Sequence, residues 1–319
     1  MLYDLIIVGG GPTGINVAVA AQKAGLNYIV IEKGVLVNSL YHFPANMTFF
    51  STSKNLEIAD IPFISHTEKP TRREAMEYYR RIVESYKLNI RYYEPAERLT
   101  ESELGYELKT AKNTYQTKNV AVTTGFYDTP RLLNIPGEDL PKVKHYYDEV
   151  HPYVDQKVLV IGAANSACDV ALECWQKGAS EVSMAIRSHE IYPRVKYWIR
   201  PNIENRIKEG SITAHFKTEV IEITDNSATL RNKDKTWIID NDFVLAMTGY
   251  QPDYELLNKL MVPTTGPHQK PDHDPNTLET SQKGIYVAGV VNAGRRTSEL
   301  FIENTRDHGE MIVGSIMKE

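Results

Sequence analysis

One hydrophobic pattern occurs twice along the chain: a short apolar run, a turn of small residues, and then apolar positions at helical spacing. The first copy begins at Leu5–Val8 and the second at Val158–Ile161. The register that superposes these two runs also superposes Gly9 on Gly162, and each copy is followed by another apolar run. The pattern predicts two strand–helix–strand units, which is typical of an α/β protein with two nucleotide sites.

Alternating apolar and polar positions follow each unit and predict antiparallel strands. The predicted strands cover residues 106–110 and 114–122 after the first unit, and 220–223, 228–231 and 236–245 after the second. Each group ends in a Thr and a glycine, at Gly125 and Gly249, which we interpret as crossings between two domains. We therefore predict a discontinuous first domain, residues 1–122 and 248–319, into which a second domain, residues 123–247, is inserted.

Three further segments have local signatures. Thr71–Glu74 fits a capping box and predicts a helix that runs to about Tyr86. The proline-rich stretch 262–284 is predicted to be a loop. A strand is predicted at 284–289, and a final helix is predicted from about Glu299 to Ile316.

The first turn carries a dinucleotide fingerprint. Gly9-Gly10-Gly11-Pro12-Thr13-Gly14 matches G-x-G-x-x-G between a strand and a helix, and Glu32 ends the next strand. The glycines allow a tight turn, a close approach of the pyrophosphate, and close packing of helix on strand. Because a carboxylate at Glu32 accepts hydrogen bonds from a ribose and repels a 2′-phosphate, we expect FAD or NAD here rather than NADP. The alternative is a glycine turn without a ligand.

The second turn, Gly162–Ala167, has alanines in place of two glycines, and its registration with the first turn gives it its significance. Its next strand ends in Arg187-Ser188 rather than in an acid. A guanidinium and a hydroxyl suit a 2′-phosphate, so we predict NADPH rather than NADH. Arg194 is close enough in sequence to contribute, although a solvated arginine explains its presence equally well.

Composition and charge exclude several function classes. The 319 residues include 36 Lys and Arg and 41 Asp and Glu, and the net charge of −5 without a basic block disfavours a nucleic-acid binder. Two cysteines exclude a disulfide scaffold and a four-cysteine metal site, and the His273-Asp274 pair lacks further ligands. No apolar run reaches the roughly 18 residues of a membrane span. We expect a soluble cytoplasmic protein that binds no metal, membrane or nucleic acid.

These features together resemble the thioredoxin-reductase-like class of flavoproteins, which have two dinucleotide-binding domains. The implied fold class is α/β, with tandem Rossmann-like three-layer ββα domains. The segment Tyr41–Thr52, the residues His145-Tyr146-Tyr147 and Phe301–Asn304, and a Val290 that follows Gly289 are similar to the YpdA family of bacillithiol disulfide reductases. The resemblance covers essentially the whole chain. It implies bound FAD, NADPH as electron donor, and a homo-oligomer, with a small-molecule disulfide or a small redox protein as partner.

The resemblance also implies which residues contact the cofactors. Near FAD we expect Gly9, Gly11, Pro12, Thr13, Gly14, Glu32, Lys33, Ser39, His42, Thr48, Gly125, Gly289, Val290 and Ile302. Near NADPH we expect Gly162, Asn165, Ser166, Ala167, Arg187, Ser188, Arg194 and Gly249. The candidates for a role close to the reacting flavin ring are Thr13, His42 and Thr48. Independently of the resemblance, the N-terminus of the final helix, near Phe301–Asn304, could direct its dipole at the flavin; the alternative is an ordinary amphipathic docking helix, and the sequence does not separate the two.

The cysteines separate this chain from two-cysteine relatives. The region before the second turn, residues 136–157, contains no cysteine, and Cys168 and Cys174 are too far apart around a helix to pair. Thr13 occupies the position where some family members have a cysteine in the first turn. We therefore predict that electrons pass from NADPH through FAD directly to a low-molecular-weight disulfide such as bacillithiol disulfide.

Other functions of the same fold remain as alternatives. A ferredoxin or flavodoxin reductase also lacks the cysteine pair, and a non-catalytic flavin redox sensor needs only the first site. A flavin monooxygenase is disfavoured, because its F-x-G-x-x-x-H motif, aligned on His145, would require Phe and Gly where Asp139 and Pro141 stand.

Overall fold

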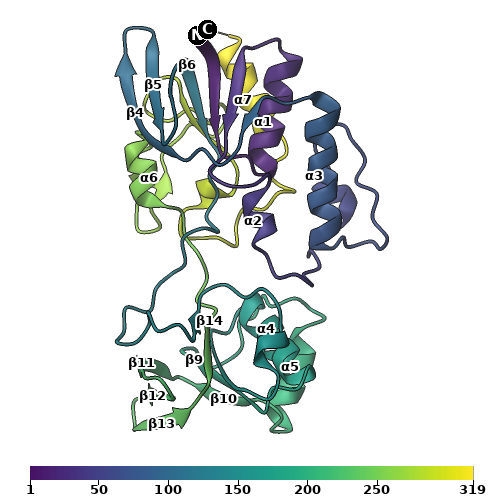
Figure 1. Ribbon diagram of the computed structural model, residues 1–319, viewed down its shortest axis with the longest axis vertical. Helices are drawn as coiled ribbons and strands as arrows, with labels where there is room; N and C mark the ends of the chain where they lie inside the picture. The colour runs from purple at the N-terminus through teal and green to yellow at the C-terminus, as the bar shows by residue number, and fades with distance from the viewer. Residues whose placement is uncertain (319) are drawn as a thin grey trace. The chain divides into compact units, whose positions relative to one another are not determined.

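The chain folds into two compact units, and the computed structural model describes residues 1–318 (Figure 1). The first unit comprises residues 1–42, 46–129 and 250–319, and the second comprises 43–45 and 130–249. The predicted domain borders are 122/123 and 247/248, whereas the compact units change at 129/130 and 249/250. Thr123 still belongs to the first unit because its hydroxyl donates to the carbonyls of Val8 and Gly9.

A seven-stranded sheet forms the centre of the first unit. Its strand order is β3-β2-β1-β6-β5-β4, and β17 lies off this path and pairs with β6. The pairing of β1 with β2 and with β6 is parallel. The strands are β1 Leu2–Val8, β2 Tyr28–Ile31, β3 Ile90–Arg91, β4 Ala96–Ser102, β5 Gly105–Thr110, β6 Thr114–Val122 and β17 Ile285–Val287, and a small hairpin adds β15 Thr264–Thr265 and β16 Lys270–Pro271. The helices are α1 Pro12–Lys23, α2 Asn38–Tyr41, α3 Arg72–Tyr86, α6 Tyr254–Lys259 and α7 His308–Ile316, with short 3₁₀ turns at Ser53–Leu56 and Val290–Ala293.

The first unit is layered around this sheet. Ile6 and Val8 of β1 pack with Leu108 of the antiparallel strands and with Leu257 of α6 on one face. Helix α1 contacts α7 and α3, and the three helices gather on one side of the sheet in Figure 1. The alternation along β1 therefore separates two buried faces, as a central strand requires.

The second unit has three layers. A parallel five-stranded sheet, β10-β9-β8-β14-β7, lies between the helices α4 and α5 and an antiparallel sheet, β11-β12-β13. The strands are β7 Val143–Lys144, β8 Lys157–Ile161, β9 Glu181–Ile186, β10 Thr213–Phe216, β11 Glu219–Ile223, β12 Ser227–Arg231, β13 Thr236–Asp240 and β14 Phe243–Ala246. The helices are α4 Asn165–Gln176 and α5 Arg200–Lys208, with a 3₁₀ turn at His151–Tyr153. The prediction of two strand–helix–strand units in an α/β protein is confirmed.

Three local predictions have clear outcomes. The capping box is present, since Thr71 and Glu74 bond reciprocally at the start of α3, which ends at Tyr86 as predicted. The strand predicted at 236–245 is two strands, because the chain turns at Asn241-Asp242 and leaves the antiparallel sheet for the parallel one. The stretch 262–284 contains the small β15–β16 hairpin as well as loop.

The final helix begins later than predicted. Helix α7 begins at His308, not near Glu299. The Asn304 side chain accepts a hydrogen bond from the Phe301 backbone at 2.7 Å, and the Thr305 hydroxyl donates to the Phe301 carbonyl at 3.0 Å. Side-chain bonds of this kind stabilise turns in place of helix. Within residues 1–318 no helix is long and apolar enough to cross a bilayer.

Candidate functional site

The first turn is shaped by close backbone contacts. Gly9 has φ +113°, and a Cβ atom there would lie 2.7 Å from the Thr123 carbonyl oxygen. A Cβ atom at Gly14 would lie 1.9 Å from the Gly9 carbonyl oxygen, so helix α1 and strand β1 approach as closely as only glycine allows. Gly11, in contrast, has nothing within 4 Å of that position. The turn therefore presents an open backbone face at the N-terminus of α1, which suits a pyrophosphate.

Glu32 closes the first turn. Its carboxylate is buried, and it accepts hydrogen bonds from the Gly10 amide at 2.6 Å and the Gly34 amide at 2.8 Å. Burial raises the pKa of Glu32, and the two backbone bonds oppose that shift. Since each carboxylate oxygen can accept more than one bond, Glu32 retains acceptor capacity for ribose hydroxyls. The chemistry of this donor and acceptor set fits the adenosine half of FAD.

Three segments of the first unit meet beside the Thr13 side chain. A Cβ atom at Gly289, which has φ +86°, would lie 2.5 Å from the Thr13 hydroxyl oxygen, and Gly125 faces a Val290 methyl at 3.8 Å from the equivalent position. The predicted residues Thr13, Gly125, Gly289 and Val290 therefore form one corner, which we call the Thr13 corner. Glycine is required at position 289 because a side chain there would collide with Thr13.

His308 holds this corner, a role that the sequence patterns do not predict. Its Nδ1 atom accepts a hydrogen bond from the Gly289 amide at 3.0 Å, and both groups are buried. Burial lowers the pKa of His308, with a smaller contribution from His273, whereas Asp307 opposes it. The ring is therefore neutral with its proton on Nε2. The sequence pattern predicts His308 inside the final helix rather than at its start, so it gives no signal of the contact with Gly289.

The other residues predicted near FAD lie in further segments of the first unit. The Lys33 ammonium forms an ion pair with Asp128 at 3.0 Å. His42 is exposed and its Nδ1 lies 2.8 Å from the Asn38 carbonyl of α2, which also carries Ser39. Thr48 is exposed, and Ile302 is half-buried in the turn before α7. The prediction that Phe301–Asn304 forms a helix N-terminus is wrong, because that end of α7 is at His308.

The second turn repeats one contact of the first. Gly162 has φ +133°, and a Cβ atom there would lie 2.6 Å from the Met247 carbonyl oxygen and 3.2 Å from the Ala167 side chain. Asn165 is half-buried, and Ser166 is exposed at the start of α4. Gly249, at φ +88°, has open space around it, and its carbonyl accepts a bond from Arg131. The second turn therefore keeps a glycine at the one position where the backbone contact requires it, and it has alanine at the other two positions of the motif.

The cations predicted at this site are accessible. Arg187 and Ser188 follow the last residue of β9 and are exposed, as is Arg194 in the loop that leads to α5. The Ser188 hydroxyl donates to the Glu190 carbonyl at 2.6 Å. Neither arginine forms an ion pair with any residue of 1–318. Two unpaired guanidinium groups beside a dinucleotide turn fit an anionic ligand.

The two cysteines are buried in α4 and are not a redox pair. Cys168 and Cys174 are free and fully buried, and burial raises the pKa of each thiol to about 12. A thiol with such a pKa does not form the thiolate that disulfide exchange requires. The described residues also contain no group of three His, Cys, Asp or Glu side chains that could hold a metal ion.

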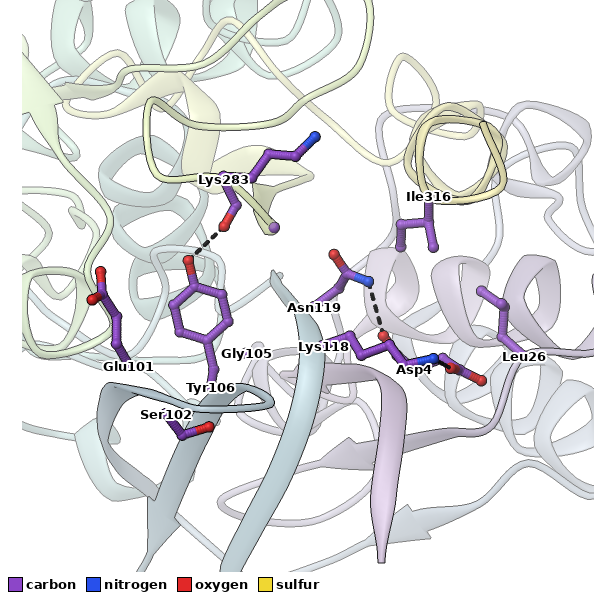
Figure 2. Close-up of a pocket in the computed structure, with 11 residues that line it drawn as sticks. Asp4, Leu26, Glu101, Ser102, Gly105, Tyr106, Lys118, Asn119, Lys283 and Ile316 are labelled. Carbon is purple, nitrogen blue, oxygen red and sulfur yellow. Dashed lines mark hydrogen bonds and ion pairs between the residues drawn. The ribbon is translucent and has the colours of Figure 1, made fainter. Parts of the chain in front are cut away.

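A cavity of about 690 Å³ opens in the first unit at the amino-terminal end of the parallel strands, near the beginnings of β1 and β17 (Figure 2). Its polar groups bond to one another: Lys118 pairs with Asp4, the Asn119 amide donates to the Asp4 carbonyl, and the Tyr106 hydroxyl donates to the Lys283 carbonyl. Ligands of open parallel sheets bind at the carboxyl ends of the strands. We therefore separate this cavity from the dinucleotide site.

Comparisons with known proteins agree with this geometry. The family described as "Pyridine nucleotide-disulphide oxidoreductase" matches residues 6–289. The chain is 42% identical over 315 residues to the bacilliredoxin reductase Bdr of Bacillus subtilis, covering 98% of this chain and 97% of that one. The structure of the bacillithiol disulfide reductase Bdr (YpdA) of Bacillus cereus is 40% identical, with a TM-score of 0.97 and full coverage of both chains. That of Staphylococcus aureus is 36% identical, with a TM-score of 0.96, and covers 100% of this chain and 99% of that one.

Proposed function

Because the chain belongs to the pyridine nucleotide-disulphide oxidoreductase family, we propose that it reduces a low-molecular-weight disulfide such as bacillithiol disulfide with NADPH, through bound FAD. In the balanced reaction, NADPH and one proton reduce one S–S bond to two thiols and leave NADP⁺. Two relatives with nearly the same fold have names that include this disulfide. The observation that carries the proposal is the pair of unlike turns, one closed by buried Glu32 and one flanked by exposed Arg187.

The proposal assigns different tasks to the residues of the two turns. The open backbone at Gly11 and the Glu32 carboxylate would hold FAD, and Arg187 with Ser188 would select the 2′-phosphate of NADPH. Bound FAD would supply the two-electron chemistry that links a nicotinamide to a disulfide. Among residues 1–318 the only thiols are buried, so a thiol relay is not available. The acceptor would therefore have to approach the Thr13 corner itself, where a hydroxyl stands in place of a thiol.

A small redox protein is the second candidate acceptor. The Bacillus subtilis relative is named a bacilliredoxin reductase, a name that does not mention bacillithiol disulfide. Both acceptors share a disulfide as the reacting group. We place the reaction in the cytoplasm, because free cysteines and NADPH belong to a reducing compartment.

An anaerobic titration tests the proposal. NADPH is expected to bleach the yellow protein, and bacillithiol disulfide is expected to restore its colour. The variant Cys168→Ala/Cys174→Ala serves as a control, and its disulfide turnover should stay within about twofold of the parent, since buried thiols with high pKa values do not exchange. Recolouring by ferredoxin or flavodoxin but by no disulfide would establish the ferredoxin reductase alternative. A flavin that NADPH cannot bleach would establish the sensor.

A further inference from the structure

The loop between β9 and α5, residues 187–199, is held against the second turn at two points. The Tyr192 amide donates to the Ala163 carbonyl at 3.0 Å, and the Lys196 amide donates to the Asn165 side chain at 2.8 Å. Both acceptors belong to the Gly162–Ala167 turn. The loop therefore cannot move away from the turn without breaking bonds on both sides of residue 194.

Arg194 lies midway between these two points. Two extended residues span at most about 7 Å, so the Arg194 backbone stays within that distance of each bonded amide. The Arg194 side chain is exposed, and it forms no ion pair with any part of the chain that the structure describes. Its guanidinium is thus kept near the turn and left available to an anion.

Lys196 is used differently, although it is also a cation of this loop. Its ammonium forms an ion pair with Asp169 of α4 at 2.8 Å, and its side chain is only 15% exposed. Burial raises the pKa of Asp169, and Lys196 opposes that shift by pairing with the carboxylate. Because this largely buried ammonium is paired with a half-buried carboxylate, it is not available to a nucleotide phosphate. Its effect is to fasten the loop to the helix that follows the turn.

We propose that the Lys196–Asp169 ion pair is a positioning device that holds Arg194 beside the second turn and thereby sets the preference for a 2′-phosphorylated nucleotide. Lys196 and Asp169 act through Arg194 and do not contact the nucleotide. This inference rests on the proposed function only in its choice of NADPH as the donor. It distinguishes Arg194, which is held in place by neighbouring bonds, from Arg187, which the end of β9 positions directly.

Two probes separate positioning from general damage. Binding of 2′,5′-ADP reports recognition of the 2′-phosphate, whereas 5′-AMP lacks that group. In the variants Lys196→Met and Asp169→Asn we expect 2′,5′-ADP affinity to fall about 5- to 20-fold, which is part of the roughly 10- to 100-fold that one charge-assisted contact contributes. Affinity for 5′-AMP should change by less than about twofold, since its recognition does not involve Arg194. In turnover assays the KM for NADPH should rise while the kcat with NADPH is unchanged. The kcat and KM with NADH should both be unchanged.

Matched variants control for folding. Lys196→Arg keeps the ion pair and should retain 2′,5′-ADP affinity. Lys157→Met removes an exposed lysine of the same unit that pairs with Asp240, and it should have no effect. In an Arg194→Ala background, Lys196→Met should cause no further loss, because the two changes act through one contact.

The outcomes are distinguishable. The positioning role is overturned if Lys196→Met loses affinity for 2′,5′-ADP and for 5′-AMP equally, or if it keeps full affinity for 2′,5′-ADP. It is also overturned if the losses of 2′,5′-ADP affinity add up in the Arg194→Ala/Lys196→Met double variant. A parent protein that binds both probes equally would contradict the choice of NADPH and with it this inference. If Arg187→Ala loses 2′,5′-ADP affinity and Lys196→Met does not, the proposed function stands and only the positioning role falls.

Discussion

The two turns share a strand–turn–helix frame, and they differ in how deeply their chemistry is buried. In the first turn, Gly9 and Gly14 are both required by backbone contacts, and Glu32 is buried and bonded to two amides. In the second, only Gly162 meets backbone, and the charged residue at the strand end is exposed. The contrast fits a resident cofactor at the first turn and a diffusible one at the second. The same strand–turn–helix frame can therefore retain a cofactor or exchange it with solvent, depending on the side chain at the end of the following strand.

The largest expected effect breaks the first turn. In Gly14→Ala the new methyl would lie 1.9 Å from the Gly9 carbonyl oxygen, so helix and strand must separate. We expect a cost of about 3 kcal/mol or more and a protein purified without yellow colour.

The reverse change at the equivalent position of the second turn provides the control. Ala167 is fully buried, and Ala167→Gly should cost only about 1 kcal/mol through helix propensity, with the flavin retained. Urea unfolding and the ratio of flavin to protein measure both variants. A Gly14→Ala protein with full flavin content and unchanged stability would contradict the steric argument.

An intermediate effect is expected when the second turn is given the charge of the first. Arg187→Glu should lower kcat/KM for NADPH about 10- to 100-fold, because a charge-assisted contact is replaced by repulsion of the 2′-phosphate. Activity with NADH should be retained or should increase. Steady-state kinetics with both nucleotides provide the measurement, and Arg231→Glu, an exposed arginine on β12, is the control. An equal loss with both nucleotides would show that Arg187 does not read the 2′-phosphate.

The smallest expected effect concerns His308, which has no counterpart at the second turn in this comparison and supports only the first site. His308→Leu removes the acceptor of the Gly289 amide and should cost about 1 to 2 kcal/mol, whereas His308→Asn keeps an oxygen near the Nδ1 position. Burial lowers the pKa of His308 in the folded protein, so the unfolded chain binds a proton more readily. The parent should therefore lose stability as the pH falls below the unfolded value of about 6.5, and this loss should be smaller in His308→Asn.

Urea unfolding between pH 5 and pH 8 measures that difference. His273 is the other histidine that acts on His308, so His273→Asn, which leaves the acceptor of the Gly289 amide in place, serves as the comparison. If the free energy of unfolding depends on pH in the same way in the parent and in His308→Asn, the neutral state assigned to His308 is contradicted.

Sequence patterns predict the parts of the site that depend on local geometry. The two turns, Glu32 at the end of β2 and the capping box at Thr71 each follow from neighbouring residues, and each has the expected structure. The start of α7 was not predictable by periodicity, because the bonds made by Asn304 and Thr305 compete with an apolar pattern that continues through them. His308 and the Lys196–Asp169 pair join segments that are distant in sequence. Their partners are defined only once the chain has folded.

The discontinuity of the first unit also has a consequence for synthesis on the ribosome. The inserted unit ends at Gly249, so its whole sequence emerges before β17 and α7 have been translated. Helix α7 packs on α1 so closely that a Cβ atom at Gly309 would lie 2.2 Å from the Asn16 side chain. The first turn is made early and its supporting helix is made last. Domains fold as units during translation, so the inserted second unit can be complete while the first turn still lacks the helix that packs against α1.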